Sequence, residues 1–227
     1  MGKLLVFYLI LRITGNPFLA IIVILAIYYF VDRRYIGLLP SIAKPFQRQR
    51  RMSYLRRQVQ LNPHDTPAKH DLAEAYIEVH KYQTALSLLE SLPKQMQGSA
   101  EILYLTGLCH LNLEDKERGE SLIIQSLEID KRLNYGEPYL RLAAGVANTH
   151  PDRAVAYLNA FQQQNVSSCE SYYRMGKLQQ LLGNSRGAQE AWRECLDTYR
   201  MLPRFRKRRD RRWAIFALFR VTFGGRG

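Results

Sequence analysis

Two runs decide the fold, KHDLAEAYIEV at residues 69–79 and YQTALSLLESL at residues 82–92, because each repeats apolar residues at helical spacing. Only a short break separates them, so they predict two amphipathic helices packed against each other. A single helix pair cannot bury all of its apolar surface. The two runs therefore predict further pairs of the same kind elsewhere in the chain.

Small residues recur with a period near 34 through residues 66–200. One column has spacings of 34, 36 and 33, and a second has spacings of 34, 35 and 34. Their members are Ala73, Gly107, Ala143 and Gly176 in the first column, and Ala85, Gly119, Ala154 and Ala188 in the second. Small side chains let helices approach closely, so the columns predict about four stacked helix pairs. Gly183-Asn184 predicts the turn inside the last pair.

This pattern resembles the tetratricopeptide repeat family, whose unit is a helix–turn–helix of 34 residues. The first unit carries its signature at Leu72, Ala73, Tyr76, Ala85 and Leu89. The second carries it at Leu103, Gly107, Gly119 and Ile123. The fourth carries it at Tyr172, Met175, Gly176, Gly183, Ala188 and Trp192. The third unit matches most weakly, at Leu142 or Ala143, Ala154 and Leu158. The resemblance implies an all-α solenoid, a right-handed superhelix whose first helices line a concave surface. Together with the apolar N-terminal run, it predicts a membrane-anchored tetratricopeptide repeat protein of bacterial type.

The sequence divides into four predicted segments. Residues 1–34 form a membrane anchor, 35–65 a basic linker with a capping helix over 46–61, 66–200 the repeat domain, and 201–227 a basic amphipathic helix. Their charge differs sharply. The first 65 residues carry ten Lys/Arg against two acids, residues 66–200 carry fourteen against seventeen, and residues 201–227 carry nine against one. The repeat domain itself is therefore not basic, which argues against a nucleic-acid-binding array.

Residues 13–31 contain no charged side chain and predict a single transmembrane helix, kinked or broken near Gly15-Asn16-Pro17. The alternative is a re-entrant hairpin, with one helix over 4–13 and a second one capped by Asn16. A cleaved signal peptide is disfavoured, because the run is long and ends in aromatic residues. Lys and Arg are in excess after the span, which predicts a single-pass protein of the cell membrane with a cytoplasmic repeat domain.

The remaining composition favours neither an enzyme nor a cofactor-binding protein. No phosphate-binding loop, nucleophile elbow or zinc spacing occurs. Cys109, Cys169 and Cys195 are expected to be small buried residues in a reducing compartment rather than a disulfide framework. We therefore expect no catalytic residue, no metal site and no cofactor.

The candidate partner site is the predicted concave groove. One first-helix column holds flat, amphipathic rings at spacings of 34, 35 and 34, and a second column lies one turn further along. Rings of this kind suit binding of a protein or peptide partner. The predicted contacts are His70, Tyr104, Tyr139 and Tyr173 from the ring column, with Glu74, Leu108 and Lys177 from the next turn. The sequence thus predicts a membrane-anchored adaptor, although these rings could instead pack between first helices.

Residues 204–212 (RFRKRRDRR) precede an aromatic run that starts at Trp213 and is too short to span a bilayer. Two predictions remain open: a helix that caps the array, and an interfacial helix on anionic lipid. RNA or ribosome contact is a third option. The candidate lipid- or anion-binding residues are Arg204, Arg206, Lys207, Arg208, Arg209, Arg211, Arg212 and Trp213.

Overall fold

The computed structural model describes residues 8–12, 15–31, 43–113, 115–164 and 168–223, and the regular structure in these ranges is helical. Residues 8–12 form a short helix ahead of the labelled elements. The helices are α2 (Pro17–Val31), α3 (Ala43–Leu61), α4 (Thr66–Glu78), α5 (Tyr82–Glu90), α6 (Lys94–Gln97), α7 (Ala100–Asn112), α8 (Lys116–Ile129), η2 (Leu133–Gly136), α9 (Glu137–Val146), α10 (Pro151–Gln162), α11 (Cys169–Leu181), α12 (Ser185–Met201) and α13 (Arg204–Phe223).

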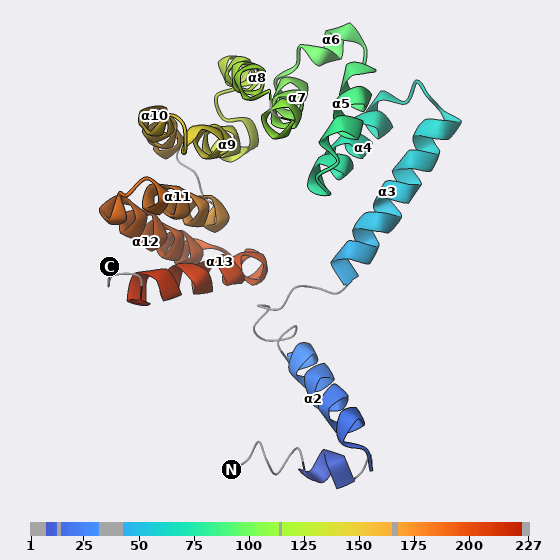
Figure 1. Ribbon diagram of the computed structural model, residues 1–227, viewed down its shortest axis with the longest axis vertical. Coiled ribbons are helices and arrows are strands. Elements are labelled where there is room, and N and C mark those ends of the chain that lie inside the picture. Colours follow the sequence, from blue (N-terminus) through green and yellow to red (C-terminus); the bar gives the residue numbers. More distant parts are fainter. Residues whose placement is uncertain (1–7, 13–14, 32–42, 114, 165–167, 224–227) are drawn as a thin grey trace.

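Helices α4 to α12 form four successive pairs: α4 with α5, α7 with α8, α9 with α10, and α11 with α12. The pairs stack along an arc, with α7 and α9 on its inner side and α8 and α10 on its outer side (Figure 1). The prediction of an all-α solenoid of about four units is confirmed.

Capping side chains fix where the helices begin, because they accept hydrogen bonds from backbone amides of the first turn. Asp65 accepts from the amide of Ala68 at 2.9 Å, and Asn184 accepts from the amide of Gly187 at 2.9 Å. These contacts satisfy backbone donors that have no partner inside the helix. Gly183 takes the left-handed φ of 78° just before Asn184, so the predicted turn of the last pair is confirmed.

The two small-residue columns form the closest contacts of the array. All eight of their members are buried. A Cβ atom added to Gly107 would lie 2.8 Å from the carbonyl oxygen of Gly119, and one added to Gly119 would lie 2.6 Å from the amide nitrogen of Leu111. Side chains larger than hydrogen would therefore push α7 and α8 apart. The predicted role of the columns in close helix packing is confirmed.

Helices α3 and α13 share the core of the array and close its two ends. Leu55 of α3 is 5% exposed and packs with the first two units. Ala214 and Ala217 of α13 are 5% and 0% exposed and pack with Trp192 of the last unit. The structure thus places α3, which includes the expected range 46–61, and α13 against the two ends of the array; capping is one of the options that the sequence leaves open for the C-terminal segment.

The third unit departs from the regular repeat at its entry. Asn134, Tyr135 and Gly136 have consecutive positive φ values of 47°, 54° and 78°. These left-handed residues form the short turn η2, which feeds α9 directly through Gly136. The extra residues of this turn account for the spacing of 36 in the first small-residue column.

The predicted break near the N-terminus is present. Gly15 has a φ of 65°, and the side chain of Asn16 accepts from the amide of Phe18 at 2.9 Å as α2 begins at Pro17. Helix α2 has 15 residues, with exposed apolar side chains such as Phe18 and Ile22. No helix in the described ranges is both long and apolar enough to cross a membrane. Residues 1–7, 13–14 and 32–34 of the predicted anchor lie outside these ranges, and the membrane span stays a prediction.

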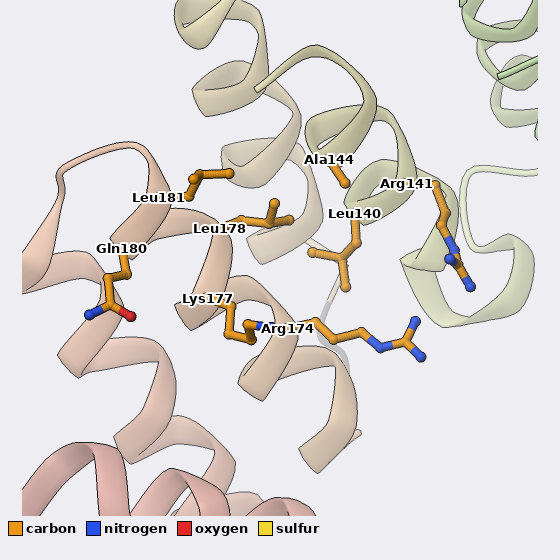
Figure 2. Close-up of a pocket in the computed structure, with 8 residues that line it drawn as sticks. All are labelled: Leu140, Arg141, Ala144, Arg174, Lys177, Leu178, Gln180 and Leu181. Atoms are coloured by element: carbon orange, nitrogen blue, oxygen red, sulfur yellow. The ribbon is translucent and has the colours of Figure 1, made fainter. Parts of the chain in front are cut away.

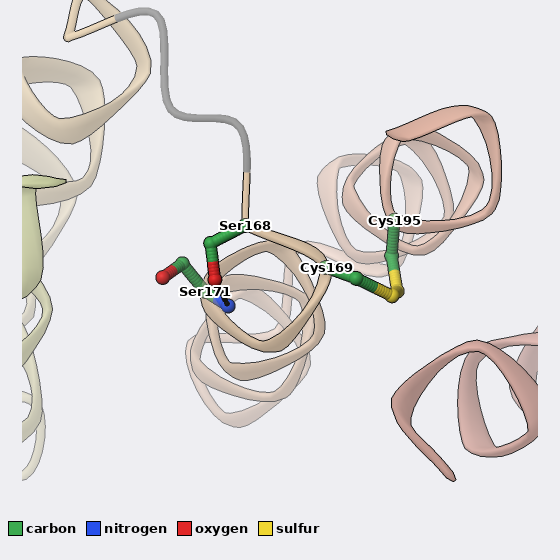
Figure 3. Close-up of a disulfide and its surroundings, with 4 residues drawn as sticks. All are labelled: Ser168, Cys169, Ser171 and Cys195. Atoms are coloured by element: carbon green, nitrogen blue, oxygen red, sulfur yellow. Dashed lines mark hydrogen bonds between the residues drawn. A yellow bond between two sulfur atoms is a disulfide. The ribbon is translucent and has the colours of Figure 1, made fainter. Parts of the chain in front are cut away.

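The cysteines differ from expectation in one respect. All three are fully buried, as predicted, but Cys169 of α11 and Cys195 of α12 form a disulfide with their Cα atoms 4.4 Å apart (Figure 3). The two cysteines lie 26 residues apart, a spacing that forms no recognisable cysteine motif, so the sequence did not predict this disulfide. The two residues meet because α11 and α12 are the two antiparallel helices of one unit. Only Cys109 remains as a free thiol.

Candidate binding groove

A hollow of about 610 Å³ lies between the first helices α9 and α11. Its wall residues come from these two helices alone, so its shape depends on how the third and fourth units stack. Figure 2 shows Leu140 of α9 and Leu178 of α11 pointing toward one another across it. The lining residues are Leu140, Arg141, Ala144, Arg174, Lys177, Leu178, Gln180 and Leu181.

The floor of the hollow is apolar. Leu140 is 3% exposed and belongs to the core of the third unit, and Leu178 packs against the same core. Leu181, by contrast, is 61% exposed at the rim. An exposed leucine beside a packed leucine floor offers apolar surface that a partner side chain could cover.

Three cations surround this floor. Arg141 donates to Glu137 at 2.8 Å, and Arg174 donates to Glu137 at 3.3 Å and to Glu170 at 2.6 Å. These contacts hold both guanidinium groups in place. Lys177 has no ion pair within the described part of the chain. Three positive charges thus face two carboxylates, which leaves one uncompensated charge on an exposed lysine.

A second hollow of about 240 Å³ continues the first one, because both are lined by Leu140 and Arg174. Ser168 and Ser171 at the start of α11 add hydroxyl groups to it. Together the two hollows, called here the α9–α11 groove, offer an apolar floor, fixed guanidinium groups and hydroxyls along one line. This chemistry suits an extended segment with an apolar side chain and a carboxylate.

The predicted ring column is only partly open to a partner. Tyr104 is 3% exposed and Leu108 is 7% exposed, so both contribute to the core of the first two units rather than to a surface. Burial raises the pKa of Tyr104, and the nearby charge of Glu137 adds to this effect. Close stacking of first helices causes this burial, because α7 is covered by its neighbours on both sides.

The other members of the column are half-buried. Tyr139 packs against both the core of the first two units and the core of the third unit. Tyr173 packs on α13, with ring centroids 5.4 Å from Trp213 and 6.0 Å from Phe216. Only Lys177, among the seven predicted partner contacts, lines the α9–α11 groove.

His70 and Glu74 lie at a different place, where α4 meets α7. The imidazole Nε2 of His70 lies 3.7 Å from a carboxylate oxygen of Glu101. Burial raises the pKa of Glu74, while His70 opposes this shift and the charges of Glu101 and Asp71 reinforce it. These two predicted residues therefore belong to a separate polar cluster on the first two units.

The predicted cationic residues occupy the first half of α13. Arg212 lies over the ring of Trp213 at 4.5 Å, and the ammonium group of Lys207 donates to the carbonyl of Arg200 at 2.9 Å. Arg206, Arg208 and Arg209 are exposed, whereas Lys207, Arg211 and Trp213 are partly buried. The side chain of Arg204 lies outside what the structure describes.

Sequence reasoning missed the arginines and leucines of the groove. Arg174 stands one turn before Lys177 on the same helix, so the spacing of these two cations was the available signal. Arg141 gave no such signal. The ion pair with Glu137 on the same helix holds Arg141 in place. Arg141 and Arg174 are 33 positions apart, and both reach Glu137 because the third and fourth units stack.

Comparison with known proteins agrees with this architecture. Two tetratricopeptide repeat models match the chain, one over residues 52–130 and the other over residues 170–200. No curated protein matches it.

Solved structures share the fold at low identity. The thermophilic TPR protein TTC0263 of Thermus thermophilus has a TM-score of 0.54 and 18% identity, over 73% of this chain and 89% of that one. A crystal structure of MamA has a TM-score of 0.50 and 14% identity, over 66% of this chain and 86% of that one. These matches agree with the helix pairs and the small-residue columns: tetratricopeptide repeat models match parts of the array, and its fold is tetratricopeptide-like.

Proposed function

We propose that the array is an adaptor that binds a protein partner through an acidic segment with an apolar side chain, seated in the α9–α11 groove. The observation that carries the proposal is the set of Arg141, Arg174 and Lys177 around the floor of Leu140 and Leu178. The guanidinium groups of Arg141 and Arg174 are held by Glu137 and Glu170, and a partner carboxylate can exchange with these contacts. The apolar floor adds affinity that does not depend on charge.

Labelled ten-residue peptides test this proposal by fluorescence anisotropy. One peptide alternates Leu and Glu, and the control peptide alternates Leu and Lys. We expect the acidic peptide to bind more tightly, and Lys177→Gln to weaken its binding about two- to fivefold, as expected for one exposed charge pair. Arg193→Gln is the matched control, because Arg193 is an exposed cation outside the groove. Equal binding of both peptides, or equal loss in both variants, would contradict the proposal.

We also propose that residues 13–31 hold this adaptor at the cell membrane, with the array on the cytoplasmic side. The uncharged run and the exposed apolar side chains of α2 support this, as does the Lys/Arg excess that follows. Anchoring would raise the local concentration of a captured partner at the membrane. In cell fractions, the full chain should resist alkaline extraction and a chain lacking residues 1–34 should not. A reporter fused after Gly227 should be active only in the cytoplasm.

Contact between α13 and anionic lipid is a second candidate function. It is favoured by exposed aromatic side chains beside the cations, since Phe205 is 80% exposed and Phe219 is 62% exposed. Vesicles with and without phosphatidylserine test it, using the chain without residues 1–34. Binding should need the anionic lipid, fall with added salt and weaken when Arg206 and Arg209 are changed to Gln. Binding of RNA instead of these vesicles would favour the nucleic-acid alternative.

A further inference from the structure

Three potential metal ligands converge where the first helix of unit one meets the first helix of unit two. They are His70 and Glu74, one turn apart on α4, and Glu101 in the first turn of α7. One ligand atom from each residue lies within 4.8 Å of the other two. The spacing of four residues places His70 and Glu74 on one face of their helix, toward the third ligand.

The imidazole of His70 has a nitrogen without a hydrogen bond. Its Nε2 atom is shielded from solvent and makes no hydrogen bond in the structure. The closest charged atom, a carboxylate oxygen of Glu101, lies 3.7 Å away, which is too long for a hydrogen bond. A shielded nitrogen without a partner is costly, and a ligand that accepts its lone pair would remove this cost.

Asp71 completes the arrangement on the other side of the ring. Its carboxylate lies 3.5 Å from Nδ1 of His70, beside the ring nitrogen that does not face Glu101. A proton on Nδ1 would leave the lone pair on Nε2, toward Glu101. A carboxylate behind a histidine is the usual support for a metal ligand, because it orients the ring and increases its basicity.

The local charge also calls for a cation. Asp71, Glu74 and Glu101 bring three carboxylates around one imidazole. Among the ion pairs of the described residues, the cation nearest to this cluster is Arg51, at 4.0 Å from Asp71. A divalent ion among these ligands would offset this excess of negative charge.

We propose that His70, Glu74 and Glu101 form a binding site for a divalent transition metal, with zinc as the best match. One imidazole with two carboxylates is a ligand set that zinc accepts, whereas calcium and magnesium prefer oxygen ligands alone. Three protein ligands are the number found in open zinc sites, and Glu101 is half-exposed, so the cluster is accessible from solvent. The site lies two units away from the α9–α11 groove and adds to the proposed adaptor function.

Zinc binding to the full chain in detergent tests the proposal, with a chromophoric chelator as competitor. We expect one zinc ion per chain, and at least tenfold weaker binding in His70→Gln and in Glu101→Gln. His150→Gln and Glu128→Gln are the matched controls, because both residues are exposed and lie outside the cluster. Both controls should bind as the wild type does.

Cobalt gives an independent readout of the ligands. The cobalt-loaded wild type should show visible absorption bands of a low-coordinate site, and Glu101→Gln should lose them. Glu101 is half-exposed, so its variant tests the site even if His70→Gln fails to fold. Wild-type zinc affinity in both ligand variants, or no zinc bound by the wild type, would overturn the proposal.

Discussion

Gly119 shows how a single hydrogen atom sets the distance between two helices. An added Cβ atom would lie 2.6 Å from the amide nitrogen of Leu111, which cannot move without moving α7. We expect Gly119→Ala to lower the free energy of unfolding by about 1–3 kcal/mol, as overpacking does in well-packed interiors. Gly98→Ala is the control, because nothing lies within 4 Å of its added atom and it should be nearly neutral. Urea unfolding of both variants measures the difference.

Cys109 is predicted to be chemically inert in the folded chain. Burial raises the pKa of its thiol to about 12, and the side chain is 0% exposed. Iodoacetamide at pH 8 should therefore leave the native protein unlabelled. After denaturation without reductant one thiol per chain should react, and after reduction all three. Three reactive thiols before reduction would contradict the disulfide of Cys169 and Cys195.

Glu74 should destabilise the metal-free protein at neutral pH. Its pKa is raised, chiefly by burial, so the folded state holds the proton more tightly than the unfolded state does. The free energy of unfolding should therefore fall as the pH rises from 4.5 through the raised pKa. With a chelator present, Glu74→Gln should be more stable than the wild type at pH 7. This advantage should vanish below pH 4.5, as thermal melts across the pH range would show.

At the scale of one element, α13 buries one face and exposes the other. Ala217 is 0% exposed beneath the helix, whereas Leu218 is 51% exposed. Ala217→Asp should lower the free energy of unfolding by at least about 2 kcal/mol, since it buries an unpaired charge. Leu218→Asp introduces the same charge on the open face and should change stability little. Chemical denaturation followed by Trp fluorescence compares the two.

The helices and their pairing were predictable because the small-residue columns repeat with every unit. Contacts between units were harder to predict. The ion pair of Glu137 with Arg174 and the approach of His70 to Glu101 join residues more than 30 positions apart. Whether these residues come into contact depends on how one helix pair is oriented relative to the next. The left-handed turn at Asn134-Tyr135-Gly136 lies between the second and third pairs, and its sequence carries only one glycine as a signal.

At the scale of the whole molecule, the core is continuous across the irregular turn. Leu142 of α9 is 0% exposed and packs with the core of the first two units. We expect Leu142→Ala to lower stability by about 2–5 kcal/mol and to uncouple the two halves of the array. Both tryptophans, Trp192 and Trp213, lie in the C-terminal half.

Two probes therefore distinguish the halves. In the wild type, unfolding followed by Trp fluorescence and by far-ultraviolet circular dichroism should coincide. In Leu142→Ala the two curves should separate, because fluorescence reports only the last unit and α13. Leu181→Ala is the control, since Leu181 is 61% exposed. Coincident curves in Leu142→Ala would mean that other contacts suffice to couple the halves.

The carboxylate of Glu137 already occupies the space between Arg141 and Arg174. An incoming acidic side chain must therefore exchange with an anion that belongs to the array itself. The contacts of Glu137 keep the two guanidinium groups ordered and lower the net free energy that an acidic partner gains on binding. For the proposed acidic partner, we therefore expect fast dissociation from the groove.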